Sequence, residues 1–414
     1  MAILASLGHI GDIATSSTLE KEWYSSAAMT APVREATIVR GGGEKWSCKI
    51  SALASGVAKG LNTRYIAATT NGHVYFFRIP IYVVTRPSAE NVIAGEGSAE
   101  TGIEWNLRLK STGEIEIRDG SVVVGTSQLL DLNTWHEIDV MVKHDGTTPN
   151  AGADFLTLKV NGTEIVSSTT QSLGSRRHFT IGGNLAAEAQ TQGEWYFGGI
   201  VINNDQAGGG FTSYMPAGLR LAYLRPTGTG TFSETTVTGG DANAWQALDD
   251  EPINTATRSD SLTNSASWAS AASRLLMAFQ NLADVGLAAA DAIQWVAVGG
   301  LFRGATGSTN AAVPGIRSGG TNADMGTSRT NTSAAFCFYS ASVGLNVYEV
   351  QYVDPTDAGA WTQAKIDNAE FGFRGSDCNP DNWCAEAWVL VAFVPRHRPR
   401  PIIINQAVNR AGTF

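Results

Sequence analysis

Strict alternation of apolar and polar residues is the dominant pattern along the first half of the chain. Residues 103–110 show it most clearly, with Ile103, Trp105, Leu107 and Leu109 alternating with Glu104, Asn106, Arg108 and Lys110. Because successive side chains of a strand point to opposite faces, this segment predicts a strand with one buried face. The same period recurs at residues 138–142 and 156–160. The pattern favours antiparallel sheets packed face to face.

Turn residues separate these predicted strands. Ser111-Thr112-Gly113 fits a three-residue hairpin connection. Asn161-Gly162 is the strongest hairpin signal, because both central residues of a type I′ turn need positive φ. Residues 73–84 are almost continuously apolar and predict a well-buried strand. Since helical periodicity is absent, we assign residues 31–225 to one β-sandwich.

The second half shifts in composition. Residues 226–240 are rich in Thr and Gly and are interpreted as a linker. Strand candidates follow at residues 273–279, 293–298, 334–339, 346–352, 370–374 and 387–393. A short helix is predicted at 362–368 with Thr362 as its N-cap, and a helix at 271–282 is an open alternative to a strand there. Residues 241–394 therefore form a second predicted sandwich.

Both ends of the chain differ from these blocks. Residues 1–30 are small and polar, and residues 395–414 are basic and interrupted by prolines. We expect both to be extended arms that are ordered mainly by contacts with other subunits. The predicted fold class is all-β, with two antiparallel β-sandwich (jelly-roll-like) domains and extended terminal arms.

Composition excludes several function classes. A formal net charge of −9 lacks the basic field of a nucleic-acid binder. The first residues lack a basic start and a sustained apolar run, and residues 388–394 are too few to span a bilayer, so no membrane partner is expected. Four cysteines in 414 residues do not make a disulfide framework, which favours synthesis in a reducing cytoplasm.

The first block carries a family resemblance. Its carrying residues are the strand at 103–110, the Trp135-His136 start of the next strand, and the LTLKVNG segment that ends at Asn161-Gly162. These resemble the concanavalin A-like, or laminin-G-like, sandwich over roughly half of the chain. The resemblance implies a fold and says little about a ligand.

The second block carries another resemblance. A PTGTG segment at 226–230 is followed by Trp245, then by Asp354-Pro355 with Trp361-Thr362, and then by Glu370-Phe371-Gly372. In this order the pieces resemble a module of tailed-bacteriophage virion proteins. The segment 248–252, with two Asp and a Glu-Pro, departs from that pattern. The motifs also have a structural interpretation, in which a turn, a Trp anchor and a capped helix hold one sandwich edge.

Three carboxylates on one predicted hairpin are candidates for catalysis. Glu114, Glu116 and Asp119 have the spacing of the E-x-D-x-x-E strand of some concanavalin A-like glycosidases, where carboxylates act as nucleophile and acid/base. The order of Asp and Glu differs here, and alternation alone produces the pattern. The scattered histidines offer no catalytic set. We therefore predict no catalytic residues.

A loop near the C-terminus offers two further candidates. Asp377, Asn379 and Asp381 have the 1-3-5 spacing of a calcium loop, but Asn382 and Trp388 stand where an EF-hand needs Gly and Glu. A looser calcium site and a solvated loop both remain open. Cys378 and Cys384 are close enough in sequence for a disulfide. No other cofactor is indicated.

The resemblances imply a non-enzymatic structural protein of a tailed-bacteriophage virion, as a capsid decoration or a tail component made in the host cytoplasm. Its partners would be other virion proteins and copies of itself. The alternatives are a carbohydrate-binding module that recognises host surface glycan, with Trp105, Trp135, Trp195 and Tyr196 as candidate platforms, and a glycosidase of the concanavalin A-like class.

Overall fold

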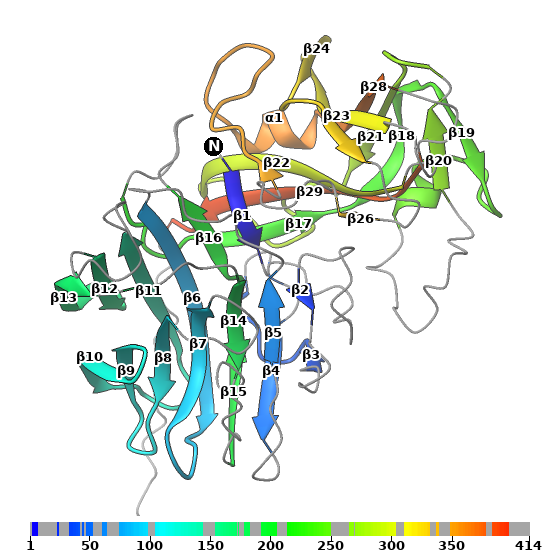
Figure 1. Cartoon of the computed structure of the whole chain (residues 1–414). Coiled ribbons are helices and arrows are strands. Elements are labelled where there is room, and N and C mark those ends of the chain that lie inside the picture. The colour runs from blue at the N-terminus through cyan, green and yellow to red at the C-terminus, as the bar shows by residue number, and fades with distance from the viewer. Residues whose placement is uncertain are drawn as a thin grey trace, which may run out of the picture.

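The protein is described by a computed structural model. The described residues are 2–6, 23–24, 33–41, 44, 47–52, 60–63, 74–97, 104–143, 154–171, 173, 178–182, 192–204, 213–249, 265–268, 270–303, 310–331, 337–338, 348–377 and 383–396. Within these ranges the regular secondary structure is almost all strand, and the strands pair antiparallel. The predicted all-β class with two sandwiches is therefore confirmed (Figure 1). No helix in these ranges is long and apolar enough to cross a membrane.

Two sheets form the first sandwich. One follows the order β13 (Thr163–Gln171), β12 (Asp154–Val160), β11 (Trp135–Lys143), β6 (Val74–Thr85), β15 (Gly193–Phe197), β4 (Ser47–Ala52) and β3 (Val33–Glu35). The other follows β10 (Val122–Leu129), β9 (Glu114–Asp119), β8 (Trp105–Leu109), β7 (Asn91–Gly97), β14 (His178–Gly182), β5 (Gly60–Thr63) and β2 (Trp23–Tyr24).

The interior of the first sandwich follows from strand alternation. Alternate residues of β6 and β8 point into one apolar cluster, where the rings of Phe77 and Trp105 pack edge to face with centroids 5.1 Å apart. The predicted Asn161-Gly162 turn is confirmed, since both residues have positive φ, 51° and 80°, and Val160 pairs with Thr163. Gly113, with φ 99°, closes the predicted hairpin between β8 and β9.

Two more sheets form the second sandwich. One follows β19 (Thr235–Thr238), β20 (Ser265–Trp268), β29 (Trp383–Val394), β22 (Ala292–Arg303) and β26 (Cys337–Phe338), with β17 (Arg220–Leu224) also paired to β29. The other follows β18 (Pro226–Ser233), β21 (Arg274–Phe279), β28 (Glu370–Asp377), β23 (Asn310–Ser318) and β24 (Thr321–Asp324), with β25 (Arg329–Asn331) paired to β23.

The predicted linker at 226–240 is wrong. Most of it forms β18 and β19, which pair with β21 and β20. Thr at alternate positions favours extended backbone, and Gly230 lies so close to the backbone of Leu276 that a side chain there would overlap it. The boundary at 225 shifts as well, because β17 already belongs to the second sandwich.

The two helix predictions have different outcomes. Residues 271–282 do not form a helix; β21 lies there, because Leu275, Met277 and Phe279 all enter the second core with a period of two. The predicted helix at 362–368 is confirmed as α1 (Gln363–Asp367), and the Thr362 hydroxyl accepts a hydrogen bond from the Lys365 backbone N–H at 3.2 Å.

The N-terminal arm is partly incorporated into the fold. Strand β1 (Ala2–Ser6) pairs with β16 (Val201–Asn204) of the first sandwich and with β27 (Tyr348–Glu349) from the second half of the chain. Residues 2–6 are therefore held within the chain, contrary to the prediction that other subunits order them. Of the predicted C-terminal arm, residues 397–414 lie outside the described residues.

Candidate functional site

The β9 carboxylates proposed for catalysis are bound to basic side chains. Glu116 is buried and forms an ion pair with Arg118. Glu114 accepts a hydrogen bond from the Thr112 hydroxyl at 2.7 Å, which lowers the pKa of this carboxyl, and Lys110 lies 3.6 Å away. A general acid needs a raised pKa, so the surroundings of Glu114 oppose that role.

These pairs belong to a charged ladder on the outer face of the seven-stranded sheet. Glu90 accepts hydrogen bonds from Arg108 at 2.9 Å and from Arg118 at 3.0 Å. Arg108 also donates to the Asn106 side chain at 3.0 Å. Because Asn106, Arg108 and Glu116 are buried, their bonds stabilise the sheet. Partly exposed members of the ladder, such as Glu90 and Arg118, can also contact a polar ligand.

The predicted calcium loop and disulfide lie mostly outside the described residues. Asp377 is the last residue of β28, whereas Asn379, Asp381 and Cys378 are not described. Cys384 is a free, fully buried thiol that donates to the Glu386 carbonyl at 3.2 Å, and burial raises its pKa. The bridge stays a prediction, because Cys378 lies outside the described residues. In the described ranges, no group of three or more His, Cys, Asp or Glu side chains is placed to hold a metal ion.

The residues of the virion-module resemblance form a structural clamp. Asp354 is fully buried, and one of its carboxylate oxygens accepts from the Thr356 backbone N–H at 2.9 Å and hydroxyl at 2.7 Å. The Trp361 indole donates to the Gln351 carbonyl at 2.8 Å. Pro355 follows in the same turn, and Phe371 enters the core on β28. The interpretation of this segment as a clamp on a sandwich edge agrees with these contacts.

Two other residues of that module also pack locally. Trp245 precedes the 3-10 turn Gln246–Leu248 and packs, partly buried, against the second core. Gly372 lies on β28 where a side chain would overlap the Leu275 backbone, so a residue without Cβ is needed there. Both positions therefore have structural roles.

The aromatic residues proposed as sugar platforms are mainly core residues. Trp105 and Trp195 are fully buried in the first core, and Tyr196 is almost fully buried. Trp135 is half-buried and packs on Tyr82, with ring centroids 5.4 Å apart. Packing therefore covers Trp105, Trp195 and Tyr196, and Trp135 is the partly exposed member of the four.

The most extensive feature that the sequence did not predict is the junction between the sandwiches, where the two blocks lie against each other (Figure 1). A third apolar cluster fills it. Its buried members are Phe76, Val201, Met215, Leu219, Leu221, Tyr223, Trp295, Ala297, Leu301, Val350, Trp388, Leu390 and Ala392. We call this set the junction cluster. It joins the outer face of β6 and β16 to the outer face of β17, β22 and β29, so four sheet layers are stacked with an apolar cluster between each neighbouring pair.

Burial on both faces explains the continuous apolar runs. On β29, Val389, Val391 and Phe393 enter the second core, whereas Trp388 and Leu390 enter the junction cluster. A strand buried on both faces loses the alternation of apolar and polar residues. The continuous apolar run at 388–394 therefore indicates a strand in a sheet that is covered on both faces.

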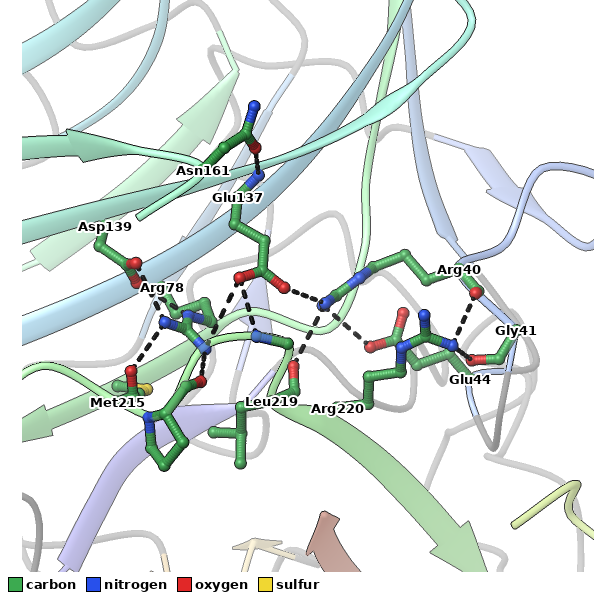
Figure 2. A network of polar contacts seen from close by, with 12 residues as sticks. Arg40, Gly41, Glu44, Arg78, Glu137, Asp139, Asn161, Met215, Leu219 and Arg220 are labelled. Atoms are coloured by element: carbon green, nitrogen blue, oxygen red, sulfur yellow. Dashed lines mark hydrogen bonds and ion pairs between the residues drawn. The ribbon is translucent and has the colours of Figure 1, made fainter. Parts of the chain in front are cut away.

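A buried ion pair lies beside the junction cluster (Figure 2). Arg78 of β6 is 1% exposed and makes two hydrogen bonds to Asp139 of β11, at 2.7 and 3.0 Å. Burial raises the pKa of Asp139, and the positive charge of Arg78 acts in the opposite direction. Arg78 also donates to the carbonyls of Met215, at 2.9 Å, and Pro216. The Arg78 guanidinium thus fixes Met215 and Pro216, which lie in the segment between the two sandwiches, to the first sandwich.

Glu137 extends this network (Figure 2). One of its carboxylate oxygens accepts from Arg40 at 2.9 Å and the other accepts from the Gly218 backbone N–H at 3.0 Å. Arg220, at the start of β17, donates to the carbonyls of Arg40 and Gly41, both at 3.0 Å. Burial lowers the pKa of Arg220. The network holds residues 215–220, which lead into β17, against the first sandwich.

The sequence held one signal for this network. Arg78 is the single charged residue within the apolar run at 73–84, and a charge in a buried strand needs a partner. Its partner Asp139 lies 61 positions away. Strand pairing places the two residues directly opposite each other, and this pairing could not be assigned from local pattern.

Comparisons with known proteins add little. No protein-family model and no curated protein matches the chain. Among solved structures, "Cellulose induced protein, Cip1" is 12% identical with a TM-score of 0.35 and covers 48% of this chain and 94% of that one. The PL-14 alginate lyase from Aplysia kurodai is 12% identical with a TM-score of 0.32, covering 49% and 99%. A mutant Trypanosoma rangeli sialidase is 13% identical with a TM-score of 0.26, covering 37% of this chain and only 30% of that one. Likenesses this weak carry no argument about activity.

Proposed function

We propose that the chain is a structural component of a tailed-bacteriophage virion, a capsid decoration or tail-associated protein that acts by packing and surface display. The observation that carries the proposal is the junction. Stacking four sheet layers with three apolar clusters makes a stiff block, because densely packed interiors transmit strain and resist deformation. A rigid block suits a subunit that is repeated on a particle.

The module residues support the same function. Asp354, Trp361 and Thr362 all serve to hold α1 against the second sandwich. The resemblance to virion proteins thus rests on residues with a structural role, in agreement with a protein whose activity lies in its surfaces. Many copies together would supply an avidity that one weak contact lacks.

Mass spectrometry and electron microscopy of particles purified from the source would test this proposal. We expect the chain in particles at many copies, and a lower incorporation of the Trp388→Ala variant, which weakens the junction. Asp324→Asn, on a partly exposed ion pair, is the matched control and should be incorporated normally. Absence of the chain from purified particles would contradict the proposal.

One observation favours glycan binding as a second candidate. The ladder on the outer face of the seven-stranded sheet includes the partly exposed side chains of Glu90, Lys110 and Arg118, which can bond hydroxyl and carboxylate groups of a sugar. A glycan array with the full chain would test it, with Arg118→Ala expected to abolish any signal. Glu114→Gln tests the glycosidase alternative, and we expect it to leave any hydrolysis unchanged, because the Glu114 carboxylate is already engaged by Thr112 and Lys110.

A further inference from the structure

In the described part of the first sandwich, the large apolar residues that are exposed gather on one sheet edge. Val122, Val123 and Leu129 of β10 are 65%, 50% and 55% exposed, and Leu132, just after the strand, is 41% exposed. In the described part of the chain, β10 pairs with β9 only, so it ends the seven-stranded sheet. A strand at a sheet edge carries backbone N–H and C=O groups that can pair with another strand.

This edge lacks the charged residues and prolines that commonly protect an edge strand against pairing. Residues 121–130 contain no charged residue and no proline, although natural edges often carry Lys or Pro. Two irregularities in the pairing with β9 bend the strand, but they leave Val123, Thr126 and Leu129 opposite Arg118, Glu116 and Glu114. Val123, Thr126 and Leu129 therefore share the outer face of the sheet with those charged residues.

The geometry points to a second copy of this chain as the occupant: we propose that β10 pairs antiparallel with β10 of another copy about a two-fold axis at Thr126. In this register Thr126 faces Thr126, and each Val123 faces Leu129 of the other copy. Facing residues of an antiparallel pair must share a face, and Val123 and Leu129 do. The two copies bring no like charges together, because the strand is neutral.

The neighbouring edge of the sandwich explains why β10 rather than β13 is the pairing strand. Val166 of β13 lies directly over Gly125, where a Cβ would overlap it, and packs partly buried against the first core. β13 therefore packs toward its own sandwich, and it also carries the charged residue Glu164, whereas β10 carries no charge. This inference rests on the proposed function, for which it names one subunit contact.

Cysteine cross-linking of the full chain tests the register. In Thr126→Cys the two sulfurs would face each other across an antiparallel pair, whose Cα separation of about 4.5–5.5 Å suits a disulfide. We expect this variant to form covalent dimers under mild oxidation. Val122→Cys is the matched control, because it lies on the same strand at 65% exposure but does not face itself in this register. Equal cross-linking at 122 and 126 would overturn the proposal.

Sedimentation of uncross-linked protein completes the test. One edge pairing is smaller than a standard interface of about 800 Å² per partner, so we expect a weak, concentration-dependent dimer. Thr126→Lys sets two like charges face to face and should weaken dimerisation at least about tenfold with an unchanged urea midpoint. A wild-type chain that stays monomeric at every concentration, or binds only a different protein through β10, overturns the inference. Incorporation into particles would still stand in that case, so the two proposals fail separately.

Discussion

The interiors of the two sandwiches and the junction between them bury apolar side chains in the same way but treat polar groups differently. The interiors are filled by alternating residues of facing sheets, such as Phe77 and Trp105. The junction adds to its apolar cluster a buried Arg78–Asp139 pair and a network of backbone carbonyls. Apolar burial is non-directional, whereas an ion pair with fixed partners is satisfied in one geometry. We infer that the polar network fixes the orientation of one sandwich relative to the other, and that the apolar junction cluster supplies most of the stabilising free energy.

Removing one partner of the buried pair should have the largest effect. Asp139→Asn leaves Arg78 charged and buried, which is expected to cost about 3–5 kcal/mol of unfolding free energy. Asp324→Asn is the control, because its pair with Arg374 is partly exposed and should cost at most about 1 kcal/mol. Urea unfolding of the full chain measures both. Equal losses would remove the distinction between buried and exposed pairs.

The second-largest loss of stability is expected from adding a side chain where β22 packs closely against Trp388. A Cβ at Gly299 of β22 would overlap the Trp388 indole, so Gly299→Ala should cost about 1–3 kcal/mol through overpacking. Gly228→Ala on β18 is the matched control, since its Cβ would lie 3.7 Å from the Ala278 Cβ, an ordinary contact. We expect this control to be neutral or slightly stabilising. Urea midpoints of the two variants measure this difference in stability. A midpoint of Gly299→Ala equal to that of the unchanged protein would show that the junction is loosely packed.

The N-cap of α1, whose hydrogen bond is exposed, should respond less. Thr362→Ala removes the side-chain oxygen that accepts the Lys365 N–H, at a cost of about 1 kcal/mol. Thr362→Ser keeps that oxygen and should retain most of the stability. Thermal unfolding of both variants provides the measurement. A loss as large as that of Asp139→Asn would mean that exposure does not govern the cost.

The smallest effect is expected from the exposed pair between Asp357 and Lys365. The hydrogen bond from Lys365, with Nζ–Oδ distances of 2.7 Å, lowers the pKa of Asp357. A lowered carboxyl pKa contributes stability that is present above the unfolded-state pKa and is lost as the pH falls through the folded-state value. NMR titration should show the pKa of Asp357 below its usual range, rising toward that range in Lys365→Met. An unchanged value in that variant would show that the backbone N–H of Gly359 dominates instead.

Local pattern accounts for most of the strands and turns. The alternation at 103–110, the Asn161-Gly162 turn and the Thr362 cap all depend on residues within a few positions of one another. The errors arose where a local signal was ambiguous. The Thr and Gly residues at 226–240 suit a linker or a strand equally well, and the choice depended on β21 and β20 as partners.

The sequence by itself determined the all-β class, the period-two cores and the capped helix at 362–368, because these follow from the side-chain geometry of an extended chain and from capping within one turn. Only the tertiary structure decided that the apolar runs of β6 and β29 are buried on both faces, that Arg78 meets Asp139 and that β1 pairs with strands from both halves of the chain. Periodicity tells which residues share a face of a strand. Periodicity carries no information on which distant sheet will cover that face, because the covering sheet is determined by packing between whole sheets.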